Sequence, residues 1–181
     1  MAIIALFAAV ICVVAPFSIA IGPIPLSLTT LIIYLAAGSL GWRCGVISVV
    51  LYVILGAVGL PVFANFEGGF QKIAGVTGGF IIGYIPCALA TGWIGGSFQK
   101  NEGRIWPCAL GMTAGTALLY TCGTVWFILQ TGSSPAYALA VCVIPFLAGD
   151  AIKIVVAGIA APRLRSAICT LRNTGGRKRE D

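Results

Sequence analysis

The stretch LAGDAIKIVVAG, from Leu147 to Gly158, decides what kind of fold this chain can form. All of its residues are apolar or glycine except Asp150 and Lys153, and each charge at the centre of a membrane helix costs about 2.5–3.5 kcal/mol on insertion scales. Spaced three residues apart, the two side chains share one helix face, where they can neutralise each other and point into one cavity. A structural ion pair between helices stays open, but ionisable residues inside membranes usually mark function. We therefore expect a polar ligand site.

The composition places the whole chain in a membrane. The 181 residues are 59% hydrophobic and 9% charged, whereas a soluble domain keeps about 25% charged residues to cover its surface. We predict an all-α integral membrane protein. The sequence has no histidine, and its seven cysteines include no C-x-x-C pair, so neither a metal site nor a disulfide framework is expected.

Breaks of glycine, proline and charge divide the chain into six predicted transmembrane helices, at about residues 2–20, 28–41, 44–59, 78–98, 105–130 and 135–161. The second and third are shorter than the ~20 residues of a straight span, so one broken helix around GWRCG (Gly41 to Gly45) is an alternative. With six spans and the N-terminus inside, nine of the eleven Lys and Arg residues lie on the inner side, as the positive-inside rule expects. Six spans with both termini cytoplasmic are therefore favoured.

Two segments outside these spans are distinctive. The connection LPVFANFEGGFQKIAGVTG (Leu60 to Gly78) is a long extracellular loop between the third and fourth helices. Such loops are often lids or binding loops, although an ordinary connection is equally open. Residues 1–162 form the predicted membrane domain, and residues 163–181 are expected to be a basic, disordered cytoplasmic tail beside anionic lipid. This tail is not expected to bind nucleic acid.

Polar and small residues suggest further contacts. In PIPLSLTT (Pro23 to Thr30), Thr29 and Thr30 either cap the second helix or face the same cavity as Asp150. In VTGGFIIGY (Val76 to Tyr84), Gly79 permits close backbone approach, and Phe80 and Tyr84 share a helix face. The pairs Gly79/Gly83, Gly41/Gly45 and Gly111/Gly115 have GxxxG spacing, and Ala5/Ala9 have the related small-xxx-small spacing; each is weak evidence for helix packing. Pro145 is expected to kink the last helix.

The sequence lacks the motifs of energy conversion and catalysis. It contains no GxxxxGK[ST] phosphate loop, no GxSxG and no HExxH. We expect no enzymatic activity and no cofactor. If ATP powers transport, another chain must hydrolyse it.

Four stretches follow one another along the chain: PIPLSLTT, GLPVFANFEGG (Gly59 to Gly69), VTGGFIIGY and PFLAGDAIK (Pro145 to Lys153). Taken together, they resemble the BioY family, the biotin-binding S components of energy-coupling-factor (ECF) transporters. Their order and spacing match over roughly residues 5–160. One departure is that this chain reads PLSLTT where the family usually reads PLTLQT, so Thr29 replaces a glutamine.

The resemblance implies an S-component fold in the plasma membrane of a prokaryote. It implies biotin bound near the outer face under the first outer loops, and a partner complex of one transmembrane coupling protein and two ATPases. The family carries AxxxA on its first helix for docking the coupling protein, and Ala5 and Ala9 fit that spacing. Asp150 and Lys153 correspond to the family's ligand contacts.

Biotin has ureido N–H donors and a carbonyl at one end and a carboxylate at the other. We expect Asp150 to accept from a ureido N–H, and Lys153 to donate to a ligand oxygen or hold Asp150 in place. Gly149 would let the ligand approach the backbone. The remaining expected contacts are Phe63, Phe80 and Tyr84 along the apolar part, and Asn65, Gln71 and Lys72 at the carboxylate. A stand-alone biotin transporter, with Asp150 carrying protons, and an S component for another vitamin stay open.

Overall fold

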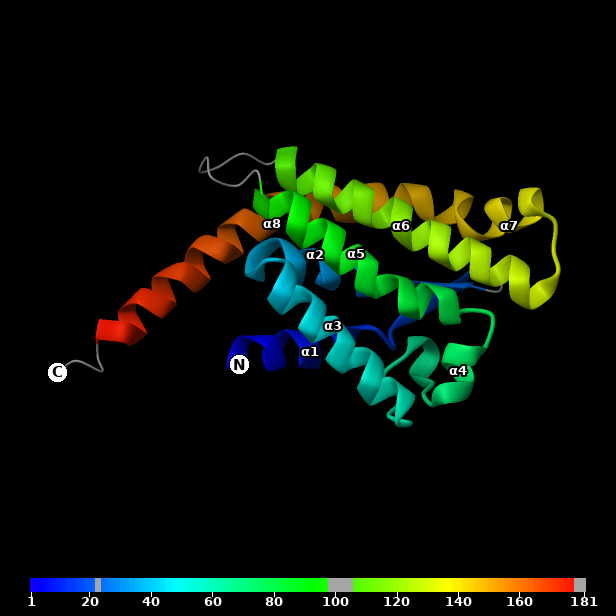
Figure 1. Cartoon of the computed structure of the whole chain (residues 1–181), viewed down its shortest axis with the longest axis horizontal. Coiled ribbons are helices and arrows are strands. Elements are labelled where there is room, and N and C mark those ends of the chain that lie inside the picture. The colour runs from blue at the N-terminus through cyan, green and yellow to red at the C-terminus, as the bar shows by residue number, and fades with distance from the viewer. Residues whose placement is uncertain (22–23, 98–105, 178–181) are drawn as a thin grey trace.

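The computed structural model describes residues 1–21, 24–97 and 106–177, which form a bundle of helices with a two-stranded sheet toward one end (Figure 1). In chain order the elements are α1 (Ala2–Val14), β1 (Ser18–Ile21), β2 (Ile24–Ser27), α2 (Thr29–Leu40), α3 (Trp42–Ala57), the 3-10 helix η1 (Ala64–Phe66), α4 (Phe70–Ala74), α5 (Gly78–Ser97), α6 (Trp106–Thr131), α7 (Pro135–Cys142) and α8 (Ile144–Arg177).

The helical fold predicted from the composition is confirmed. Three apolar helical segments are long enough to cross a bilayer, namely Gly78–Gly96, Trp106–Thr131 and Pro135–Ile168. Helices α1, α2 and α3 are apolar but have only 10–17 residues, fewer than the ~20 of a straight span. The number of membrane crossings therefore stays a prediction.

The first predicted span is wrong at its C-terminal end. Helix α1 ends at Val14 instead of residue 20, and residues 18–21 form β1, which pairs antiparallel with β2. Pro16 follows the end of the helix and has no N–H for a helical hydrogen bond. Residues 18–20 are therefore part of a hairpin and not of a helix, so the chain is not purely α-helical.

The last predicted span is interrupted. Helix α7 ends at Cys142 and α8 begins at Ile144, so the chain bends at Val143. Pro145 explains the position, because it cannot donate to the carbonyl of Val141 four residues earlier. The kink expected at this proline is confirmed.

The C-terminal tail differs from its expected disorder. Helix α8 continues to Arg177, and Figure 1 shows its last turns extending away from the rest of the bundle. The prediction of a disordered tail is therefore wrong for residues 163–177, where the helix simply continues beyond the apolar stretch. Its last part, residues 178–181, lies outside the described residues.

The connection between α3 and α5 has structure of its own. It contains η1 and α4, and the backbone of Gly69 donates to the carbonyl of Gly56, 2.7 Å away. Phe63 is only 1% exposed within it. In Figure 1, α4 lies toward the same end of the bundle as α7. This connection is therefore folded back onto the end of α3.

Helices α5 and α6 meet through glycines on both surfaces. A Cβ on Gly79 would lie 2.2 Å from the Cβ of Trp126, and one on Gly83 would lie 3.0 Å from Leu119. From the other side, a Cβ on Gly111 or Gly115 would lie 2.8 Å from a backbone oxygen of α5. The small-residue packing predicted at these two glycine pairs is confirmed.

We predict that Gly79→Ala destabilises the protein, because its new Cβ would overlap Trp126. Overpacking of this kind costs about 1–3 kcal/mol. Thermal unfolding in detergent, followed with a dye that reacts with buried thiols such as Cys87 and Cys142, should give a lower midpoint. Gly96→Ala is the matched control. Gly96 lies on the same helix as Gly79, and a Cβ there would meet nothing within 4 Å. Equal midpoints for the two variants would contradict this packing role.

Candidate functional site

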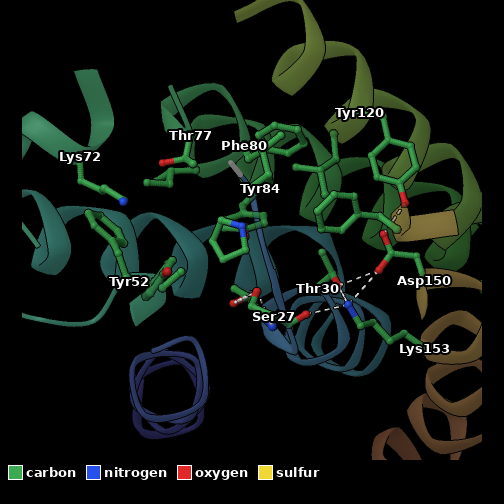
Figure 2. A pocket seen from close by; sticks show the side chains of 18 residues that line it. Ser27, Thr30, Tyr52, Lys72, Thr77, Phe80, Tyr84, Tyr120, Asp150 and Lys153 are labelled. Carbon is green, nitrogen blue, oxygen red and sulfur yellow. Dashed lines mark hydrogen bonds and ion pairs between the residues drawn. The ribbon is translucent and has the colours of Figure 1, made fainter. Parts of the chain in front are cut away.

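A pocket opens where β2, the α3–α5 connection and the ends of several helices converge (Figure 2). The region spans about 670 Å³ of non-atom space, part of which is open solvent. Its walls come from seven segments of the chain and consist of Ile24, Pro25, Ser27, Thr29, Thr30, Tyr52, Phe63, Ala64, Lys72, Thr77, Phe80, Ile81, Tyr84, Leu119, Tyr120, Phe146, Asp150 and Lys153.

Asp150 and Lys153 form an ion pair in the wall of this pocket. The Nζ of Lys153 lies 2.9 Å from Oδ1 of Asp150, and the two residues are 7% and 4% exposed. Both project from α8 on one face, as their spacing predicted (Figure 2). A buried pair of this kind persists only where other groups complete its hydrogen bonding.

The ammonium of Lys153 is fully paired. Besides Asp150, it donates to the backbone carbonyl of Ser27 at 2.6 Å and to the hydroxyl of Thr30 at 3.1 Å. An ammonium has three N–H donors, and these three acceptors use all of them. Lys153 thereby joins α8 to the end of β2 and the start of α2.

The carboxylate of Asp150 keeps some capacity to accept. Its Oδ1 accepts from Lys153 and, at 3.4 Å, from the hydroxyl of Thr30, while its Oδ2 accepts from the hydroxyl of Tyr120 at 2.6 Å. An ionised carboxylate offers about four acceptor positions. Three of these positions are used, so Oδ2 keeps one position for a further donor.

Sequence reasoning missed Tyr120 and Ser27. Tyr120 lies in α6 among apolar residues, where a phenol reads as ordinary packing, and only the fold brings it to Asp150. Ser27 contributes its backbone carbonyl, which no side-chain motif reveals. Its position within PIPLSLTT was the available signal.

The alternative roles of Thr29 and Thr30 are decided by the start of α2. Leu28 occupies the N-cap position, and the N–H of Thr29 donates to the hydroxyl of Ser27 at 3.4 Å, so neither threonine caps this helix. Both threonines line the pocket instead, 1% and 6% exposed. The Thr29 hydroxyl lies 2.8 Å from the hydroxyl of Ser27. Thr29 is thus a polar wall residue.

The predicted aromatic residues line the apolar part of the pocket. Phe63, Phe80 and Tyr84 all belong to its wall. Tyr52 joins them, packing edge-on against Phe63 with ring centroids 5.6 Å apart. Such edge-to-face pairs are favourable and fix ring orientation. The contact with Tyr52 therefore stabilises Phe63 in the pocket wall.

Two glycines make room for these rings. A Cβ on Gly56 would lie 2.2 Å from the ring of Phe63, and one on Gly123 would lie 2.4 Å from the ring of Phe80. A side chain at either position would overlap an aromatic ring that lines the pocket. These glycines therefore allow the two rings to occupy their places in the wall.

Lys72 lines the pocket on the opposite side from Asp150 and Lys153 (Figure 2). It belongs to α4 and forms an ion pair with Glu67. The side chain of Lys72 is 24% exposed and that of Glu67 is 48% exposed. The pocket therefore has polar groups at both sides and an aromatic wall between them.

Four of the expected contact residues do not line the pocket. Gly79 packs against Trp126 of α6, and Gly149 precedes Asp150 without reaching the cavity. Asn65 is exposed and accepts from the hydroxyl of Ser18 at 3.0 Å, and Gln71 is exposed on α4. Spacing along the chain could not show which loop side chains turn inward.

Two further expectations concern other parts of the chain. Ala5 and Ala9 are both exposed on α1, whose buried residues are Ala8 and Ile11. Within residues 1–21, 24–97 and 106–177, no group of three or more His, Cys, Asp or Glu side chains is placed to hold a metal ion.

Comparison with known proteins identifies the family. The model of the BioY family matches residues 1–170. The chain belongs to the BioY family. The family predicted from the four sequence stretches is thereby confirmed.

Relatives match over nearly their whole length. A protein of Thermotoga maritima named biotin transporter BioY is 40% identical, over 88% of this chain and 92% of its own. A probable biotin transporter BioY of Pyrococcus horikoshii is 38% identical, over 90% and 94%. The crystal structure of the S-component for biotin from an ECF-type ABC transporter is similar with a TM-score of 0.83 at 25% identity, covering 91% of this chain and 89% of that one.

We predict that Lys153→Met lowers the thermal midpoint strongly, because it leaves the buried carboxylate of Asp150 without its cation. Breaking one partner of a buried pair costs about 3–5 kcal/mol. The double variant D150N/K153M removes both charges and should recover much of the loss in the same unfolding assay. A double variant no more stable than Lys153→Met would show that the pair does not act as a unit.

Proposed function

We propose that this chain is the biotin-binding S component of an ECF-type vitamin transporter and has no enzymatic activity. The observation that carries the proposal is the pocket with the buried Asp150–Lys153 pair in its wall. Support comes from membership of the BioY family and from similarity to a solved S-component for biotin. Biotin is the transported ligand, and no cofactor is required.

The polar group around Asp150 suits the ureido ring of biotin. A ureido N–H donates to the open position on Oδ2 of Asp150, a charge-assisted hydrogen bond. Lys153 already donates to three acceptors, so its main part is to orient the carboxylate of Asp150. This choice refines the expectation that Lys153 either contacts the ligand or positions the acid.

The rest of the ligand follows the length of the pocket. The thioether ring and aliphatic chain lie against Phe63, Phe80 and Tyr84. The carboxylate reaches the side where Lys72 lines the pocket (Figure 2). Of the expected trio of Asn65, Gln71 and Lys72, only Lys72 lines the cavity. We therefore assign the carboxylate contact to Lys72 alone.

Transport requires partners and an orientation in the membrane. The chain has no phosphate loop, so two ATPase subunits supply the energy through a transmembrane coupling protein. The exposed face of α1 that carries Ala5 and Ala9 is where the coupling protein docks. Both termini face the cytoplasm of a prokaryotic cell, as the basic residues favour, and the pocket then opens to the outside.

Biotin binding is tested by titrating detergent-purified protein with biotin, riboflavin and thiamine, following heat or tryptophan fluorescence. We expect one-to-one binding of biotin alone. Asp150→Asn should weaken it about 10- to 100-fold, because a hydrogen bond to a charged group contributes about 1.5–3 kcal/mol. Asp181→Asn makes the same chemical change in the tail and should leave affinity unchanged. Wild-type affinity in Asp150→Asn would remove Asp150 from the site.

The docking face is tested by uptake in cells that express the whole transporter. Replacing Ala5 and Ala9 together by Leu should abolish biotin uptake while binding persists, because bulky side chains keep a partner helix from close approach. Ala136 and Ala140 have the same spacing and are both exposed on α7, so replacing them by Leu is the matched control. Uptake that survives in the α1 variant would place the docking face elsewhere.

A further inference from the structure

The charges of the pocket do not balance within its walls. Among the described residues that line it, the charged side chains are Lys72, Asp150 and Lys153. Asp150 and Lys153 neutralise each other at 2.9 Å. Lys72 remains as a positive charge on the opposite side of the pocket, where it forms an ion pair with Glu67 outside the cavity (Figure 2).

Glu67 closes a tight turn of the α3–α5 connection. Its carbonyl accepts from the N–H of Phe63 at 2.9 Å, which closes a tight turn in which Asn65 and Phe66 have φ values of 62° and 58°. Non-glycine residues rarely adopt this left-handed conformation, so the turn is strongly determined by its surroundings. Because Phe63 is 1% exposed and forms part of the wall, this turn ties the backbone of Glu67 to the pocket wall.

We propose that Glu67 is a specificity-determining residue that competes with the carboxylate of the ligand for the ammonium of Lys72. The proposal rests on the proposed function, in which Lys72 meets the carboxylate of biotin. An ammonium has three donors and can hold two carboxylates. The two acids then share one positive charge and repel each other at short range. Glu67 therefore lowers the preference of the pocket for an anionic ligand over a neutral analogue.

The exposure of the pair sets the size of the effect. The side chains of Lys72 and Glu67 are 24% and 48% exposed, so solvent screens the attraction between them. Exposed ion pairs of this kind change an equilibrium by about two- to fivefold. Removing the charge of Glu67 should raise the preference for the acid by that factor, and added salt should reduce the gain.

The test compares biotin with biotinamide, in which an uncharged amide replaces the carboxylate. Dissociation constants are measured for the full-length wild type and for Glu67→Gln, Lys72→Gln and Glu102→Gln in detergent. The readout is the Kd of biotinamide divided by the Kd of biotin. A general loss of structure raises both dissociation constants and leaves their ratio unchanged. A change in the interaction with the ligand carboxylate alters the ratio.

We expect the ratio to rise about two- to fivefold in Glu67→Gln and to fall toward one in Lys72→Gln. Glu102→Gln removes an acid that the sequence places in an inner connection, and it should leave the ratio unchanged. If Glu67→Gln does not purify as folded protein, Glu67→Asp withdraws the carboxylate from Lys72 by one methylene and should raise the ratio less. An unchanged ratio in the folded variant overturns the proposal, and a lower ratio shows that Glu67 positions Lys72 instead.

These results separate the inference from the function on which it rests. Biotin binding in the wild type, with no change of the ratio in Glu67→Gln, refutes only the role of Glu67. No binding of biotin by the wild type refutes the proposed function and the role of Glu67 with it.

Discussion

The buried ion pair of Asp150 and Lys153 constrains the architecture around the pocket. Two charges removed from water cost several kcal/mol each, and their attraction offsets this cost only when the remaining donors and acceptors are satisfied. Ser27, Thr30 and Tyr120 complete that hydrogen bonding from β2, α2 and α6. The pair on α8 therefore brings segments distant in the sequence to one side of the pocket.

Packing of small residues gives the rest of the pocket its shape. Glycines let α5 and α6 approach closely, and Gly56 and Gly123 leave space behind the rings of Phe63 and Phe80. The α3–α5 connection then completes the wall with Phe63 and Lys72. Aromatic rings between two polar sides suit an elongated ligand with hydrogen-bonding groups at both ends.

Local sequence patterns predicted some of these features and missed others for physical reasons. The spacing of Asp150 and Lys153, and of Phe80 and Tyr84, placed side chains on shared helix faces because the helical repeat is fixed. Hydrophobicity alone could not separate the end of α1 from the hairpin after it, since both are apolar. Asn65 and Gln71 have suitable chemistry, but the turns of the α3–α5 connection leave them exposed.

The sequence by itself determined the membrane-type composition, the helical class, the family and the acid–base pair on the last helix, because these depend on residue type and on spacing within one element. Only the tertiary structure decided that Tyr120 and the Ser27 carbonyl complete the pair, that Gly79 packs helices, and that Glu67 pairs with Lys72. Contacts of this second kind join segments whose relative position arises when the whole chain packs, and no local repeat encodes that position.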